Sequence, residues 1–207
     1  MNSEKALIFD FDGTIADSGL KIYEILNEIL PAFGIKKVGE SEIERLRGMN
    51  AKNLLKELNV PIYKLPLIYY KFEEEYQKII KDVKLVPGIL EVLDKLSEKG
   101  IKMYIASSNS AESINIFLDY NKIKYFSLIK GNSGMMGKSR IIKKIISEEK
   151  LIPENVVYVG DEIRDIDSAR KAGISSAAVT WGFNNKKALL EYEPDYLLEK
   201  PADLLTL

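Results

Sequence analysis

Short hydrophobic runs alternate with helical repeats over most of the chain. Residues 6–9 form an apolar run that is too short for a helix and is followed by Asp and Gly, so it predicts a buried strand. Runs of similar character predict further strands at residues 101–106, 126–130, 156–159, 176–180 and 195–197. Between most of these runs, apolar residues at three- and four-residue spacing predict helices.

One long segment carries helical patterns only. From residue 20 to about residue 82 the apolar positions predict four helices with no strand between them. The segment Ser41-Glu-Ile-Glu44 is typical of a capping box that begins the second helix. Asn50 is placed to cap the third, and the fourth extends from about residue 64 to residue 80.

These patterns together predict an α/β fold. Strands that alternate with helices are typical of a doubly wound, mainly parallel sheet with helices on both faces. The helical segment departs after the first strand and returns before the second, so we interpret it as an insertion. The predicted division is an α/β core at residues 1–15 and 85–207 and an all-helical cap at residues 16–84.

Composition and charge exclude several classes of function. The chain of 207 residues is 46% hydrophobic, and 30 basic residues face 31 acidic ones, so no general field attracts nucleic acid or a membrane. Cysteine and histidine are absent, which excludes disulfides, thiolate nucleophiles, serine–histidine triads and histidine-bound metals. Catalysis must therefore use carboxylates, lysines, hydroxyl groups and a hard cation. No signal peptide or membrane span is visible in the sequence, and we expect a cytoplasmic protein.

Two carboxylates follow the first predicted strand. Asp10 and Asp12 come at its end, and Gly13 then allows a tight turn. Ligands sit at the carboxyl ends of parallel strands, and two acidic side chains placed there repel each other. A cation must hold them together, and Mg²⁺ is the candidate with the right preference for oxygen ligands.

Other predicted strands also end in polar residues. These are Ser107 and Ser108 after residues 101–106, Lys138 after a glycine-rich loop at residues 131–137, and Asp161 with Asp165 after residues 156–159. Together with the first pair they supply an acidic metal site, neutral donors and a cation, a set that suits a phosphate group bridged by Mg²⁺.

The motifs Asp10-Phe-Asp12-Gly-Thr14 and Gly160-Asp161-x-x-x-Asp165 carry a resemblance to a known family. The chain resembles the haloacid dehalogenase-like phosphohydrolases that carry a helical cap after the first motif, with closest similarity to the phosphoglycolate phosphatase-like branch. The likeness covers essentially the whole chain and implies a Rossmann-like core.

By this resemblance, Asp10 is the nucleophile that takes the phosphoryl group, and Asp12 donates a proton to the leaving alcohol and later accepts one from water. The resemblance also implies that Mg²⁺ is held by the Asp10 carboxylate, the main-chain carbonyl of Asp12 and Asp161. Asp165 is expected to orient metal-bound waters or Lys138.

The phosphate group is expected to contact Ser107, the main-chain N–H near Ser108, and Lys138. The family often carries Lys-Pro here, whereas Lys138 follows a glycine, so Lys130 is the competing candidate. Ser107 and Lys138 can also be explained without a role in phosphate binding. Ser107 can simply begin a helix cap, and Lys138 can lie on a solvated helix face.

The predicted cap is expected to select the substrate, a small phosphate ester. Arg47 and Lys52 lie at a turn between predicted helices and can pair with a second anionic group, although a solvated turn explains them equally well. Ala51 replaces a basic residue of related β-phosphoglucomutases, which disfavours a sugar-phosphate mutase. A phosphomutase, a dehalogenase and a phospho-accepting signalling receiver stay open as alternatives. The expected state is a monomer or small homo-oligomer.

Overall fold

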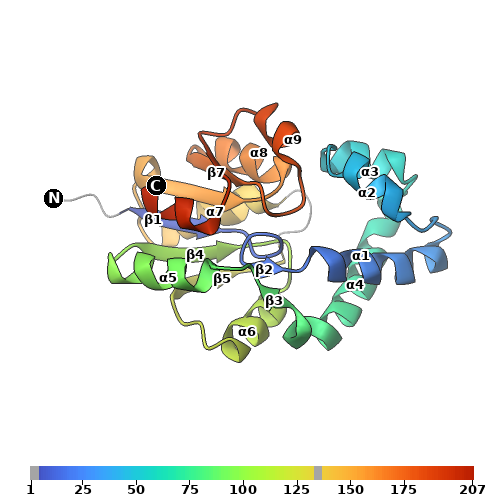
Figure 1. Cartoon of the computed structure of the whole chain (residues 1–207), viewed down its shortest axis with the longest axis horizontal. Coiled ribbons are helices and arrows are strands. Elements are labelled where there is room, and N and C mark those ends of the chain that lie inside the picture. Colours follow the sequence, from blue (N-terminus) through green and yellow to red (C-terminus); the bar gives the residue numbers. More distant parts are fainter. Residues whose placement is uncertain (1–4, 133–136) are drawn as a thin grey trace.

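The computed structural model describes residues 5–132 and 137–207, and its centre is a sheet of six parallel strands. In spatial order the strands are β5 (Phe126–Lys130), β4 (Lys102–Ala106), β1 (Ala6–Phe9), β6 (Val156–Gly160), β7 (Ser175–Val179) and β8 (Tyr196–Leu198). The first strand along the chain is therefore central, with β4 on one side and β6 on the other (Figure 1). The predicted α/β fold class is confirmed.

Helices cover both faces of this sheet. They are α5 (Ile89–Glu98), α6 (Ala111–Tyr120), α7 (Lys138–Glu148), α8 (Ile163–Ala172) and the short α9 (Lys186–Leu190). Successive residues of β1 point to opposite faces, so Phe9 packs in the same cluster as Phe117 of α6, and Ile8 packs in the cluster that contains Ile142 of α7. Burial on both faces explains why the strand is hydrophobic throughout instead of alternating.

The chain between residues 18 and 83 is helical and contains no strand. It comprises α1 (Gly19–Ile29), α2 (Glu40–Leu46), α3 (Ala51–Glu57) and α4 (Leu65–Ile79), with short 3₁₀ turns between and after them. A two-stranded antiparallel ribbon, β2 (Ala16–Asp17) and β3 (Lys84–Leu85), joins both ends of this segment to the rest. The proposed division near residues 16 and 85 stays a prediction, and the ribbon lies at those positions.

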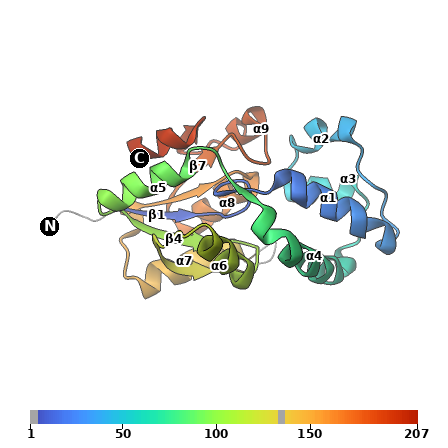
Figure 2. The same cartoon turned by 60° about the horizontal axis from the view of Figure 1, so that its bottom comes forward.

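Figures 1 and 2 show α1 to α4 grouped beyond the end of the sheet toward which β1 runs from the N-terminus. The helical segment therefore lies over the carboxyl ends of the strands, where the predicted site residues are. No helix among residues 5–132 and 137–207 has the length and apolar character needed to cross a membrane.

Local capping was predicted with mixed success. Asn50 caps α3 by accepting a hydrogen bond from the N–H of Asn53, as expected. The predicted start of α2 at Ser41 is wrong, because the helix begins at Glu40 and the Glu42 carboxylate accepts from the N–H of Gly39. A glutamate that reaches back to the N–H three residues earlier can thus cap the start of the helix without a serine hydroxyl.

Candidate active site

Adjacent strands bring the predicted residues together. Asp10 follows β1 and Asp161 follows β6, and β1 and β6 are paired in register. Ser107 follows β4, the neighbour of β1 on its other side. Asp10 continues the ladder, since its N–H donates to the carbonyl of Val159 at 2.8 Å. Parallel pairing therefore places these side chains at one edge.

Asp10 and Lys138 form a buried ion pair. The Lys138 Nζ lies 2.6 Å from Asp10 Oδ2 and 2.5 Å from Asp165 Oδ1, and each of the three residues is 2% exposed. The other oxygen of Asp10 accepts from the N–H of Phe11 at 2.8 Å. Burial disfavours the charged ammonium, but the two carboxylates outweigh it and the pKa of Lys138 is raised. Lys138 is therefore a fixed cation beside Asp10.

Asp161 is held by a close-fitting backbone. Its Oδ1 accepts from the hydroxyl of Thr14 at 3.0 Å and its Oδ2 from the N–H of Phe183 at 2.7 Å. A Cβ on Gly13 would lie 2.3 Å from Asp161 Oδ2, and one on Gly182 would lie 2.2 Å from Asp161 Cβ. Gly13 also has φ +71°, which favours glycine. The Asp-Gly step of the first motif is thus required both by its turn and by its contact with the second motif.

Three buried carboxylates lie close together, as the ligands of a bound cation do. Asp10, Asp161 and Asp165 each offer an oxygen, and these oxygens lie within 4.8 Å of one another. Burial, with the neighbouring negative charges, raises the pKa of Asp161 well above its ordinary value. Burial also raises the pKa of Asp165 to about 6, although Lys138 opposes it. One lysine does not neutralise three carboxylates, so the donor set fits a hard divalent cation.

Asp12 is half-buried and is held by two donors that sequence reasoning missed. The hydroxyl of Tyr76, on α4, donates to its Oδ1 at 2.5 Å, and Asn109 Nδ2 donates to its Oδ2 at 2.8 Å. Burial is the main cause that raises the pKa of Asp12, and these two hydrogen bonds oppose the rise. Asn109 lay in the polar turn after a predicted strand, but Tyr76 gave no signal beyond an apolar position on a helix.

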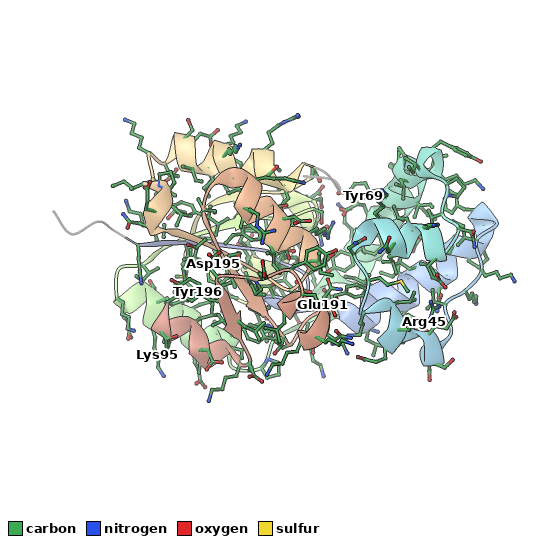
Figure 3. The ribbon with its side chains drawn as sticks, turned by 90° about the horizontal axis from the view of Figure 1, so that it is seen from above. Arg45, Tyr69, Lys95, Glu191, Asp195 and Tyr196 are labelled. Carbon is green, nitrogen blue, oxygen red and sulfur yellow. The ribbon has the colours of Figure 1, made fainter. Side chains whose placement is uncertain are left out.

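The two serines lie in the turn after β4. Ser107 is 1% exposed, and its Oγ accepts from the N–H of Asn109 at 3.2 Å. Ser108 connects two parts of the chain, because its Oγ accepts from Arg164 at 3.1 Å and its carbonyl accepts from the hydroxyl of Tyr69 on α4 at 3.0 Å. Figure 3 labels Tyr69 where the helical segment meets the core.

The competing lysine, Lys130, points elsewhere. Its Nζ lies 2.8 Å from Glu148 at the end of α7, while Lys138 at the start of α7 contacts Asp10. The geometry thus favours Lys138 as the cation of the site. Within the predicted glycine-rich loop, residues 133–136 lie outside the described part of the chain.

Arg47 and Lys52 differ in their surroundings. Arg47 Nε donates to the carbonyl of Phe183 at 2.7 Å and its Nη2 to the carbonyl of Gly182 at 3.0 Å, so it joins α2 to the segment that holds Asp161. Lys52 is exposed and forms no hydrogen bond or ion pair within residues 5–132 and 137–207. Neither side chain contacts the carboxylates of the site in this arrangement.

Known proteins are similar to this chain over most of its length. The sequence matches the family described as haloacid dehalogenase-like hydrolase over residues 7–179. A phosphoglycolate phosphatase of Synechococcus elongatus is 32% identical over 202 residues, covering 97% of this chain and 95% of that protein. A phosphoglycolate phosphatase of Aquifex aeolicus is 28% identical and covers 98% of this chain and 96% of that protein.

Solved structures agree with the sequence matches. A haloacid dehalogenase-like hydrolase from Streptococcus pneumoniae has a TM-score of 0.83 and 27% identity, covering 100% of this chain and 99% of that one. The similarity therefore includes the helices between β2 and β3 as well as the sheet.

Proposed function

The chain belongs to the haloacid dehalogenase-like hydrolases, and on that premise we propose that it is a Mg²⁺-dependent phosphatase of a small phosphomonoester. Hydrolysis proceeds through an aspartyl-phosphate on Asp10. The observation that carries the proposal is the position of Asp10, which lies beside a buried lysine and within reach of two further buried carboxylates.

In the first step a carboxylate oxygen of Asp10 attacks phosphorus. The new oxygen–phosphorus bond forms as the bond to the substrate alcohol breaks, and Asp12 gives its proton to that alcohol. In the second step water attacks the phosphorus, Asp12 takes the proton of that water, and Asp10 and inorganic phosphate are released. Tyr76 and Asn109 support this role, because they fix both oxygens of Asp12.

The raised pKa of Asp12 suits a group that must hold a proton and then accept one. Its causes are burial and the neighbouring charge of Asp10, opposed by the hydrogen bonds. A carboxyl with an ordinary pKa is almost fully ionised at neutral pH and is a poorer proton donor.

Mg²⁺ would be held by the carboxylates of Asp10 and Asp161 and by the main-chain carbonyl of Asp12. When bound, it neutralises negative charge, so that an anionic substrate can approach an anionic nucleophile. Asp165 acts as a positioning residue, because its two oxygens accept from Lys138 and from the N–H of Glu162. Ser107, the N–H of Ser108 and Lys138 contact the transferring phosphoryl oxygens.

Turnover of p-nitrophenyl phosphate tests the proposal. We expect sustained release of phosphate with Mg²⁺, its loss with a chelator, and its recovery when Mg²⁺ is returned. Asp10→Asn should lower kcat by at least about 10⁴-fold while the circular dichroism spectrum stays unchanged. Full turnover by Asp10→Asn would exclude Asp10 as the nucleophile.

The same assay separates the alternatives. A dehalogenase needs no metal, so loss of phosphate release in chelator is the opposite of what it predicts. A receiver stops after a single phosphoryl transfer, and a mutase transfers phosphate between positions of a sugar instead of releasing it. Release of many equivalents of inorganic phosphate per protein excludes all three.

A further inference from the structure

One face of α4 points toward the carboxyl end of the sheet. Tyr69, Glu73 and Tyr76 occupy this face, because residues three and four positions apart lie together on a helix. Tyr69 donates to the carbonyl of Ser108, and Tyr76 donates to Asp12. Glu73 lies between these two contacts along the helix. We name these three residues the α4 face.

Both carboxylate oxygens of Glu73 are buried, and no donor among the described residues reaches them with the geometry of a good hydrogen bond. The hydroxyl groups of Ser110 and Tyr69 and the main-chain N–H of Ser110 are close enough to lower the pKa of Glu73, in opposition to burial. In the structure they donate to other acceptors: the Ser110 hydroxyl to Ser113, the Ser110 N–H to Asn109, and Tyr69 to Ser108. A buried carboxylate without a good hydrogen bond lowers the stability of the fold. A role of this group must therefore explain why it is buried.

The neighbouring glutamates of α4 form ion pairs with a lysine of the same helix. Glu74 and Glu75 both pair with Lys71, at 2.9 Å and 3.0 Å, on the outer side of the helix. Glu73 is the acid of this run that turns inward. Burial raises the pKa of Glu73, and the negative charge of Asp12 adds to the rise.

The charges already present at this end of the sheet disfavour a second anionic group on the substrate. Lys138 is paired with Asp10 and Asp165, and Arg164 is paired with Glu162 at 2.6 Å. An anionic group that approached the α4 face would meet Glu73 and Asp12, and like charges repel. A donor group would instead complete the missing hydrogen bonds of Glu73.

We propose that Glu73 contacts the alcohol portion of the substrate, which leaves when the phosphoryl group is transferred. At that position Glu73 selects a hydrogen-bond donor, an ammonium or hydroxyl group, against a carboxylate. The inference rests on the phosphatase function proposed above and narrows its substrate class to phosphomonoesters of amino alcohols or polyols. It also separates this chain from the relatives whose names specify phosphoglycolate.

Three two-carbon esters of similar size test the inference: phosphoethanolamine, 2-hydroxyethyl phosphate and phosphoglycolate. They carry an ammonium, a hydroxyl and a carboxylate at the same position. We expect kcat/KM for the wild type to be at least about tenfold higher for one of the two donor esters than for phosphoglycolate. Comparison of the two donor esters identifies which donor Glu73 prefers.

Glu73→Gln should reduce that preference at least about tenfold, mainly through KM, because it removes the charge and keeps the shape. Glu74→Gln makes the same change in charge one residue away, on the exposed side, and should leave the preference unaltered. As a second measurement, Glu73→Gln should unfold at an equal or higher temperature than the wild type, because a buried partnerless charge is removed.

The outcomes distinguish the two proposals. If p-nitrophenyl phosphate and all three esters are left intact, the phosphatase function fails and the inference with it. If the protein hydrolyses them but prefers phosphoglycolate, or if Glu73→Gln keeps the wild-type preference, the phosphatase function stands and the role of Glu73 is overturned. A large loss of thermal stability in Glu73→Gln would identify a structural carboxylate and would equally overturn the inference.

Discussion

Lys138 illustrates how a single buried charge organises the site. Its ammonium contacts two carboxylates from different elements, Asp10 after β1 and Asp165 in α8, and all three groups are removed from water. Such groups are tolerated only when they are paired. Removing one partner costs more than the pair contributes, because the remaining charges stay buried. Lys138 therefore holds Asp10 and Asp165 together, in addition to its proposed contact with the phosphate.

This asymmetry gives a prediction that also separates the two candidate lysines. Lys138→Ala should lower the free energy of unfolding by about 3 kcal/mol in the presence of a chelator, because Asp10 and Asp165 are left facing each other. Lys130→Ala removes a more exposed pair with Glu148 and should change it by less than about 1 kcal/mol. Urea unfolding measures both. Equal effects of the two substitutions would contradict the assignment of Lys138.

At the scale of helices and strands, the sequence predicts those features that a local pattern of residues determines. The strand at residues 126–130 and the cap at Asn50 follow from short apolar runs and side-chain chemistry. The ribbon of β2 and β3 was missed because strands of two residues carry no periodicity. The contact between Tyr76 and Asp12 was missed because it depends on how α4 packs over the sheet, which no local pattern encodes.

Helix α4 thus connects the helical segment to the proposed catalytic acid. Tyr76→Phe removes the hydroxyl that donates to Asp12 and keeps the ring, which stacks on Phe72 at 5.3 Å. We expect kcat for p-nitrophenyl phosphate to fall about tenfold with little change in KM, because Asp12 loses one of two donors. Tyr70→Phe, on the exposed side of the same helix, is the matched control. Unchanged kcat in Tyr76→Phe would show that this hydrogen bond does not orient the acid.

At the scale of the whole molecule, hydrogen bonds between described residues join the helical segment to the core on at least two sides. On one side α4 contacts Ser108 and Asp12. On the other side, hydrogen bonds join the end of α2 and the start of α3 to residues 182–185 and to Tyr192. Phe183 belongs to this second contact and its N–H also binds Asp161. The position of the helices and the geometry of the candidate cation site are therefore physically linked.

Arg47 distinguishes a structural link from substrate recognition. If its bonds to Gly182 and Phe183 hold the helices in place, Arg47→Ala should raise KM by a similar factor, about three- to tenfold, for every phosphomonoester, including p-nitrophenyl phosphate. It should also speed hydrogen exchange of amides in α2 and α3, because local opening becomes easier. Lys52→Ala should change neither quantity, since Lys52 is exposed. An increase in KM confined to esters that carry a second anionic group would instead mean that Arg47 leaves the carbonyls of residues 182 and 183 and pairs with the substrate.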